Sequence, residues 1–322
     1  MTIVKYLNPR NDIAFKKIFG TEKNKDILIH FLNDVIVTGG NGEIKKVTLL
    51  NPTQYPDIAT SKQSVVDVLC EDEHGITYIV EMQVAKVAGF EKRAQYYAAK
   101  AYASQPEKGD KTYDHLKAVI FLAITEYEMF PKKKEYKSDH VILDKDSYDH
   151  DLKDFSFTFI ELPKFKKEAH ELKNYEEKWC YFFKHANNAD NIEELIANSD
   201  EVIKKAYHQL RAHNWTKEEL RAYEASEKSA RDARAREKYV HGEGLAEGIA
   251  KGMAQGLEKG MAEGIAKGIA KGKIEGLVEG RIEIAKTMLL ENEPIEKIHK
   301  FTGLSAADIK NIEGNIKSKE LL

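Results

Sequence analysis

The sequence has few of the features that mark secreted, zinc-binding or membrane-spanning proteins. It contains only two cysteines, Cys70 and Cys180, in 322 residues, which excludes a disulfide framework, and no C-x-x-C pair suggests zinc. Both lie among apolar residues, so we expect buried free thiols. No window approaches the ~18 uncharged apolar residues of a membrane span, and no apolar run at the N-terminus is typical of a signal peptide. We therefore expect a bacterial cytoplasmic protein without a membrane segment.

The sequence also lacks an excess of charge of either sign. Its 50 basic and 53 acidic residues give a formal net charge of −3, so no overall basic surface is available to attract nucleic acid. Any DNA-binding site must then be a local patch. The chain is long enough for a sizeable hydrophobic core and for two units.

One stretch contains two apolar strand patterns, each with an acidic residue among its apolar residues. Residues 65–70 and 76–85 are rich in β-branched residues and flank a polar segment, which predicts a β-hairpin. A turn near His74 places Asp67 of the first run opposite or nearly opposite Glu81 of the second. Like charges across a ladder destabilise it, and a divalent cation would remove that penalty because hard cations bind carboxylate oxygens. Alternatively, both acids lie on one exposed face and are solvated.

The acids also form a motif. Asp67, followed on the next strand by Glu81-Met82-Gln83, resembles the core of the PD-(D/E)XK nucleases, with Gln83 in the usual lysine position. The resemblance implies that Asp67, Glu81 and the Met82 carbonyl hold Mg²⁺ or another divalent cation. The metal would activate a water and neutralise charge on the cleaved phosphate, and Gln83 would orient the water or the phosphate. Because an amide carries no charge, Gln83 does not replace lysine as a cation, and this departure puts the rate of cleavage in question.

Two further segments carry the same resemblance. Residues 12–19 (DIAFKKIF) and 90–97 (FEKRAQYY) resemble the recombination-promoting nucleases and transposases of the Rpn family. The resemblance covers roughly residues 6–185, and the glycine repeat further on is also similar to that family. It implies an α/β fold with a PD-(D/E)XK nuclease-like mixed sheet flanked by helices and an all-helical C-terminal extension.

The pattern of the other elements agrees with a mixed α/β sheet. Apolar spacing predicts a helix from Asn11 or Asp12 to about Val37 and another over residues 88–105. The most continuous apolar run, residues 116–124, predicts a strand buried on both faces. We expect further strands at residues 43–50, 140–143 and 155–162, and later helices at residues 192–203 and 217–239. A helix that bridges two strands favours a mixed sheet over an all-β sandwich.

Four basic residues are candidate DNA contacts. Lys16 and Asp12 either face the metal site or, in the case of Asp12, serve only as the N-cap or as a first-turn acid that matches the dipole of the first helix. Arg93 lies in the first turns of the second predicted helix, where an anion such as phosphate or a carboxylate of the fold would compensate its charge. Lys133 and Lys134 lie in a basic loop with a tyrosine, which either contacts a backbone phosphate or is a solvated turn.

The chain divides into four predicted segments. They are a nuclease-like core (1–163), a charged helical extension (164–240), a helical repeat with glycine at every fourth residue (241–281) and a small helical C-terminal unit (282–322). Each interior glycine costs a helix about 1 kcal/mol, so the repeat from Gly244 to Gly280 is either a helix that packs against a second copy or a disordered tail. The last unit resembles a helix-turn-helix and either binds DNA or acts as a packing or dimerisation cap.

These features together predict a metal-dependent DNA endonuclease. It would be an Mg²⁺-dependent hydrolase that cleaves phosphodiester bonds, serves recombination or mobile-element activity, and forms a homo-oligomer through residues 244–280. The alternative is a catalytically weak or inactive DNA-binding or scaffolding protein that oligomerises through the glycine repeat. A metal-dependent cleavage assay separates the two.

Overall fold

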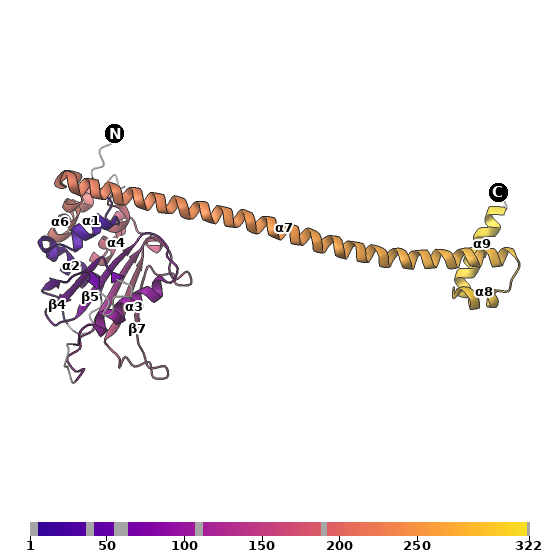
Figure 1. Ribbon diagram of the computed structural model, residues 1–322, viewed down its shortest axis with the longest axis horizontal. Helices are drawn as coiled ribbons and strands as arrows, with labels where there is room; N and C mark the ends of the chain where they lie inside the picture. Colours follow the sequence, from indigo (N-terminus) through magenta and orange to yellow (C-terminus); the bar gives the residue numbers. More distant parts are fainter. Residues whose placement is uncertain (1–5, 37–41, 55–63, 107–111, 188–191, 321–322) are drawn as a thin grey trace. The chain divides into compact units, whose positions relative to one another are not determined.

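The computed structural model describes residues 6–36, 42–54, 64–106, 112–187 and 192–320. It consists of two compact units, Met1–Ala235 and Arg236–Leu322. The first contains the sheet, and the second is helical (Figure 1).

A six-stranded mixed sheet forms the centre of the first unit. Its strand order is β1-β4-β5-β6-β8-β7; β5–β6 and β6–β8 are parallel, and the other neighbours are antiparallel. The strands are β1 (Val47–Leu49), β4 (Val68–Asp72), β5 (Thr77–Gln83), β6 (Val119–Thr125), β7 (Lys137–Val141) and β8 (Phe155–Glu161). A separate ladder joins β2 (Thr53–Gln54) to β3 (Ser64–Val65). The predicted mixed α/β sheet is confirmed.

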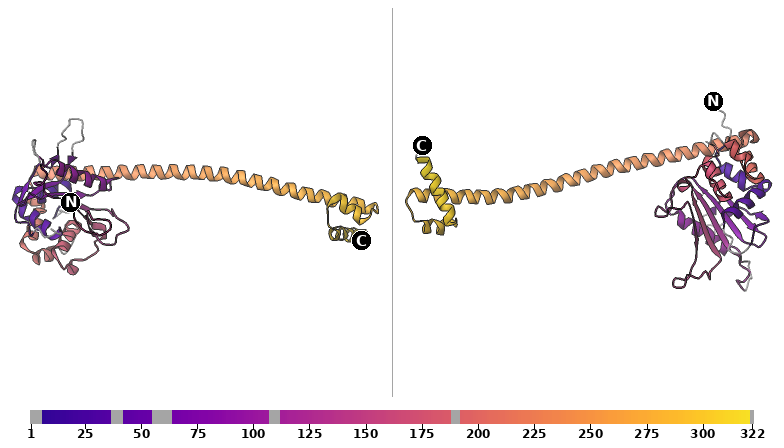
Figure 2. Two further views of the ribbon diagram at one scale, coloured as in Figure 1. Left: turned by 90° about the horizontal axis from the view of Figure 1, so that it is seen from below. Right: turned by 180° about the vertical axis from the view of Figure 1, so that it is seen from behind.

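Helices cover both faces of this sheet. Helix α3 (Phe90–Ala103) connects the parallel strands β5 and β6 and packs on one face. The other face is covered by α1 (Asp12–Phe19), α2 (Lys25–Val35), α4 (Tyr175–His185) and α6 (Glu201–Gln209). Every residue of β6 is buried, as predicted, because alternate side chains enter the two cores. Figure 2 shows the same strands and helices from two further directions.

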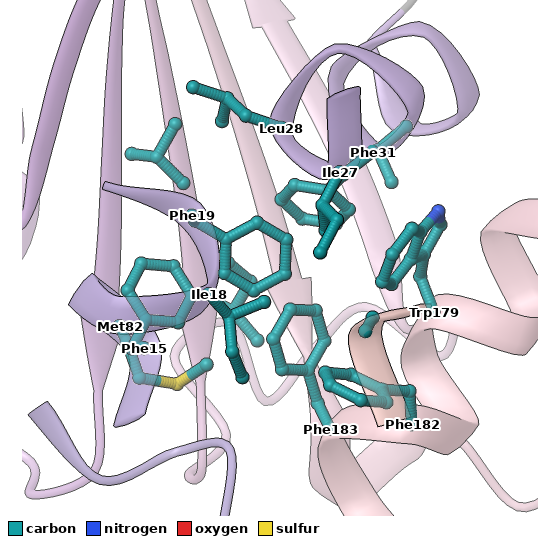
Figure 3. Close-up of a cluster of buried hydrophobic side chains, with 14 of the residues drawn as sticks. Phe15, Ile18, Phe19, Ile27, Leu28, Phe31, Met82, Trp179, Phe182 and Phe183 are labelled. Atoms are coloured by element: carbon teal, nitrogen blue, oxygen red, sulfur yellow. The ribbon is translucent and has the colours of Figure 1, made fainter. Parts of the chain in front are cut away.

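A cluster of aromatic side chains ties the N-terminal helices to α4 (Figure 3). Phe19 of α1 lies 5.1 Å from Phe31 of α2 between ring centres, and Phe31 lies 5.4 Å from Trp179 of α4. These rings are fully buried. Helix α4, from the predicted charged extension, therefore shares the core that holds α1 against the sheet.

Several predicted elements are shorter or divided. Gly20 ends α1, where its N–H donates to the Lys16 carbonyl at 2.8 Å, so the predicted first helix is two helices. The predicted helix at residues 192–203 is also two, because the Asp200 side chain caps α6 at its first turn. The predicted strand at residues 43–50 is reduced to β1. The remaining short helices are η1 (Glu22–Asn24), η2 (Leu162–Lys164), η3 (Ala169–Glu171), α5 (Ile192–Ala197) and η4 (Ala212–Asn214).

Helix α7 (Lys217–Leu290) begins in the first unit and continues into the second. Its start is a capping box, in which the Thr216 and Glu219 backbone N–H groups donate to each other's side chains at 2.8 and 3.2 Å. The glycine repeat lies within α7 and is helical, as one interpretation predicted. Its residues are exposed, and a Cβ placed on any glycine from Gly244 to Gly280 meets no atom within 4 Å. Packing against a second copy therefore stays a prediction.

The second unit has a small hydrophobic core of its own at its C-terminal end. Helices α8 (Ile295–Thr302) and α9 (Ala306–Glu320) pack with the end of α7 around Ala285, Ile298 and Ile309. Gly303 ends α8 at φ 68°, a backbone conformation that favours glycine. None of the helices described is long and apolar enough to cross a membrane.

Candidate metal and nucleic-acid site

Asp67 and Glu81 lie opposite each other at the open end of the β4–β5 hairpin. The ladder pairs Val68 with Val80, and the same register continued by one residue places Asp67 opposite Glu81. The sequence pattern predicted that Asp67 lies inside a strand. The structure corrects this, because Asp67 lies in a bend just before β4. Its carboxylate accepts the Met82 backbone N–H at 2.9 Å. The side chain thus replaces the backbone acceptor of a continued ladder and holds Asp67 beside Glu81.

Glu81 is a buried carboxylate with one unsatisfied oxygen. The residue is 4% exposed. Its Oε2 accepts a hydrogen bond from Gln83 Nε2 at 3.0 Å, whereas Oε1 is buried and has no hydrogen-bond partner in the described part of the chain. Burial and the charge of Asp67 raise the pKa of Glu81 to about 8. A buried acceptor without a partner is rare in native proteins, so this oxygen points to a missing positive ligand.

The pKa of Asp67 is also raised, to about 6. Burial is the main cause, while the Met82 N–H and the charge of Lys16 oppose it. The two raised pKa values show that the surrounding protein does not supply enough positive charge for two ionised carboxylates.

Arg93 of α3 approaches the acids through Gln83. Its guanidinium donates to Gln83 Oε1 at 2.7 Å, which leaves the amide Nε2 to face Glu81. The same guanidinium lies 4.8 Å from the ring centre of Phe90 and 5.9 Å from that of Tyr97. Its Nε is buried and has no hydrogen-bond partner among the described residues. We expected a phosphate or a carboxylate of the fold beside Arg93. The structure instead places the uncharged amide of Gln83 there, and the Nε–H donor has no partner among the described residues.

Helix α1 brings Lys16 and Asp12 to Asp67. Lys16 Nζ lies 2.7 Å from the Asp12 carboxylate and 3.5 Å from that of Asp67. Asn11, and not Asp12, caps α1, because its side chain accepts the N–H groups of the first turn. Asp12 is instead the acid in the first turn of α1, and it lies beside the candidate site through Lys16, so the two interpretations of Asp12 are compatible.

All these groups meet where the parallel strands β5, β6 and β8 end. The carboxyl ends of parallel strands are where open α/β sheets bind their ligands. Tyr127 follows β6 at this edge, and its hydroxyl is buried without a hydrogen-bond partner in the described residues. Burial raises the pKa of Tyr127, and the nearby charge of Arg93 lowers it. Tyr127 is not predicted from the sequence, because nothing in its local pattern shows that the β5–β6 crossover brings it to Arg93.

The phosphate contact expected of the basic loop stays a prediction. Lys133 Nζ lies 3.2 Å from His140 Nε2 and 5.1 Å from the centre of the Phe130 ring, and Lys134 is exposed. Tyr136 instead donates its hydroxyl to Glu176 at 2.6 Å. Within the described chain, neither lysine contacts the two acids.

The donors present fit a hard divalent cation that keeps part of its water. No group of three or more His, Cys, Asp and Glu side chains converges as a metal site in the described ranges. A cation between Asp67 and Glu81 would therefore need backbone and water ligands as well, which suits Mg²⁺, because Mg²⁺ commonly binds one or two carboxylates and retains several waters. Cys70 and Cys180 are buried free thiols, as predicted.

A family model described as PD-(D/E)XK nuclease family transposase matches residues 9–239. The matched segment includes the whole sheet, α1, α3 and the first part of α7, and it contains every candidate site residue. Searches of curated proteins and of solved structures found no match.

Proposed function

The chain belongs to the PD-(D/E)XK nuclease family transposases, and from that premise we propose that it is a metal-dependent DNA endonuclease. The proposed reaction is hydrolysis of a phosphodiester bond, in the service of recombination or mobile-element activity. The observation that carries the proposal is the opposed pair of carboxylates, half-buried Asp67 and buried Glu81, of which Glu81 has an unsatisfied oxygen.

Each residue of the site has a proposed role. Asp67, Glu81 and the Met82 carbonyl would hold Mg²⁺ or another divalent cation, which supplies Lewis-acid activation of water and neutralises charge on the phosphate. Gln83, fixed by Arg93, would orient the attacking water or a phosphate oxygen. A hydrogen bond at 2.7 Å fixes this amide, which supports a positioning role.

Two cationic side chains compensate for the missing lysine of the motif. Lys16 lies on the α1 side of Asp67, and Arg93 lies on the α3 side of Gln83. Ammonium and guanidinium groups bind phosphate oxygens with charge-assisted hydrogen bonds. We propose that these two groups hold the DNA backbone at the site, and that the basic loop with Lys133 and Lys134 adds contacts further along the strand.

A second candidate function is a catalytically weak or inactive DNA-binding or scaffolding protein. The exposed apolar residues of the glycine repeat favour an assembly role, because Leu245, Met253 and Ile265 are 58%, 72% and 63% exposed. A homo-oligomer formed through residues 244–280 is compatible with both candidates.

A cleavage assay with a matched control separates them. The full-length protein and the Asp67→Ala variant are incubated with supercoiled plasmid in Mg²⁺, in Mn²⁺ and in EDTA. The control is Asp144→Ala, which removes an exposed acid from the loop after β7. We expect metal-dependent nicking by the parent and the control, and none by Asp67→Ala.

Asp67→Ala should keep its fold, because the lost hydrogen bond from the buried Met82 N–H costs about 1–3 kcal/mol, and removing a half-buried carboxylate from beside Glu81 offsets part of that cost. Nicking by Asp67→Ala at the parent rate would show that the site is elsewhere. No nicking by the parent in either metal would favour the second candidate.

A further inference from the structure

A pocket of about 350 Å³ opens between α3 and the β8–β7 end of the sheet. Four of its eight lining residues carry aromatic rings, two are aliphatic and two are polar residues of α3; the lining includes Phe130, His140, Phe157, Phe159, Glu91 and Gln95. The proposed cleavage chemistry uses none of these side chains.

Three of the rings, Phe130, His140 and Phe157, are half-buried and so keep part of their surface accessible to a ligand. The ring centres of Phe130 and His140 lie 5.1 Å apart at an interplanar angle of 37°. Phe159 is buried and packs nearly perpendicular to both rings, at 5.3 and 5.4 Å between ring centres. Burial and the charge of Lys133 lower the pKa of His140, which keeps the imidazole uncharged at neutral pH.

The pocket adjoins the acid pair across a single helix. Glu91 and Gln95 are four residues apart and share one face of α3, whereas Arg93 between them points to Gln83. The loop after β6 also connects the pocket with the acid site. Its Tyr127 lies near Arg93, and its Phe130 lines the pocket. The pocket and the acids are thus separated by about one helix diameter, roughly 10 Å.

We propose that this pocket binds an unpaired base of the DNA strand that is cleaved, so that the substrate is single-stranded or locally opened DNA. This inference rests on the proposed nuclease function. Aromatic faces stack on any base, and Glu91 and Gln95 offer an acceptor and a donor to a base edge. Lys133 Nζ lies over the Phe130 ring at 5.1 Å, where it is placed for the adjacent phosphate. An apolar segment of another protein would not use these polar groups.

The test compares DNA strands with and without bases. The full-length protein is titrated in EDTA, where no cleavage occurs, with a labelled single-stranded oligonucleotide, with an abasic strand of the same length and charge, and with a duplex. Stacking on aromatic side chains contributes about 1–3 kcal/mol per base, which corresponds to about 5- to 150-fold in Kd. We therefore expect the parent to bind the base-bearing strand at least about fivefold more tightly than the abasic strand.

Variants assign this preference to the pocket. Phe130→Leu and Phe157→Leu keep apolar bulk but remove a ring, and each should lower the ratio of the two Kd values by about fivefold or more. Phe157→Tyr keeps the ring and should retain the ratio. The matched control is Phe155→Leu on the same strand, because Phe155 packs on Tyr102 at 4.9 Å outside the pocket. Affinity for the duplex should be the same in all of these proteins.

Equal binding of base-bearing and abasic strands by the parent would overturn the proposal, whatever the variants do. A loss of the ratio in Phe155→Leu as large as that in Phe157→Leu would also overturn it. The outcome is distinguishable from failure of the nuclease assignment: a protein that nicks plasmid but shows no base preference keeps the first proposal and loses this one. A protein that binds base-bearing strands more tightly but never nicks plasmid keeps the base-binding pocket and loses the nuclease assignment.

Discussion

Replacing Glu81 with glutamine removes a buried ionisable carboxyl with little change in the shape of the side chain. The carboxyl has an ordinary pKa of 4.5, and in the fold its pKa is raised to about 8. Between these values the unfolded chain is ionised and the folded chain still holds its proton, so the metal-free protein should lose stability as pH rises from 4.5 to about 8. One pKa unit corresponds to about 1.4 kcal/mol. At pH 7, Glu81→Gln should therefore stabilise the metal-free protein by up to about 3 kcal/mol.

Urea unfolding in EDTA, followed by tryptophan fluorescence, measures this gain. The chain has two tryptophans, and both Trp179 and Trp215 are buried in the first unit, so the signal reports the unit that holds the site. The control is Glu126→Gln, because Glu126 lies at the same sheet edge but is paired with Arg10 at 2.6 Å. Its loss should be neutral or destabilising. At pH 8, Mg²⁺ should stabilise the parent by binding only the folded state and should leave Glu81→Gln unchanged. A Glu81→Gln variant that is less stable than the parent at pH 7 in EDTA would refute the reasoning, as would metal-dependent cleavage by that variant at the parent rate.

Three further predictions address other parts of the molecule. Gln83→Lys should retain or raise the cleavage rate, because it restores a positive charge near the phosphate; loss of activity with metal binding retained would instead show that the two amide hydrogen bonds are required. Replacing Gly256, Gly260 and Gly264 with leucine should shift the sedimentation of the full-length protein toward monomer with little change in cleavage per chain, and a monomeric parent would contradict this. His30 lies 2.6 Å from Asp34 and 3.4 Å from Asp200. Burial lowers the pKa of His30, but these carboxylates raise it above 6.5 overall. The stability that the charged His30 contributes is therefore complete below pH 6.5 and is lost as pH rises through the folded pKa. His30→Gln should flatten that loss in urea unfolding, and an unchanged pH profile would count against it.

The elements that the sequence predicts well are those whose pattern is local. The fully buried β6 and the hairpin are examples, and the opposition of Asp67 and Glu81 follows from the turn, since register is set by turn position. Gly20 shows where local patterns fail. A glycine in a helical pattern costs only about 1 kcal/mol, so its presence alone does not decide whether the helix continues. Contacts with the rest of the fold decide it.

The parts of the site that the sequence does not predict depend on distant contacts. Asn11 and Asp12 are both good capping residues, and only the position of α1 beside Asp67 shows that Asp12 faces the site. Tyr127 reaches Arg93 because β5 and β6 are adjacent across a connection that contains α3. The aromatic pocket likewise combines residues from α3, β7, β8 and the loop after β6, and no single segment reveals it.

The most direct test of the metal site is a crystal structure of the full-length protein soaked in Mn²⁺, with anomalous diffraction recorded at the manganese edge. We expect one strong anomalous peak in contact with carboxylate oxygens of Asp67 and Glu81 and with the Met82 carbonyl, and no peak there in Glu81→Gln. A peak elsewhere in the first unit, with the Asp67–Glu81 position empty at saturating Mn²⁺, would contradict the proposed metal centre.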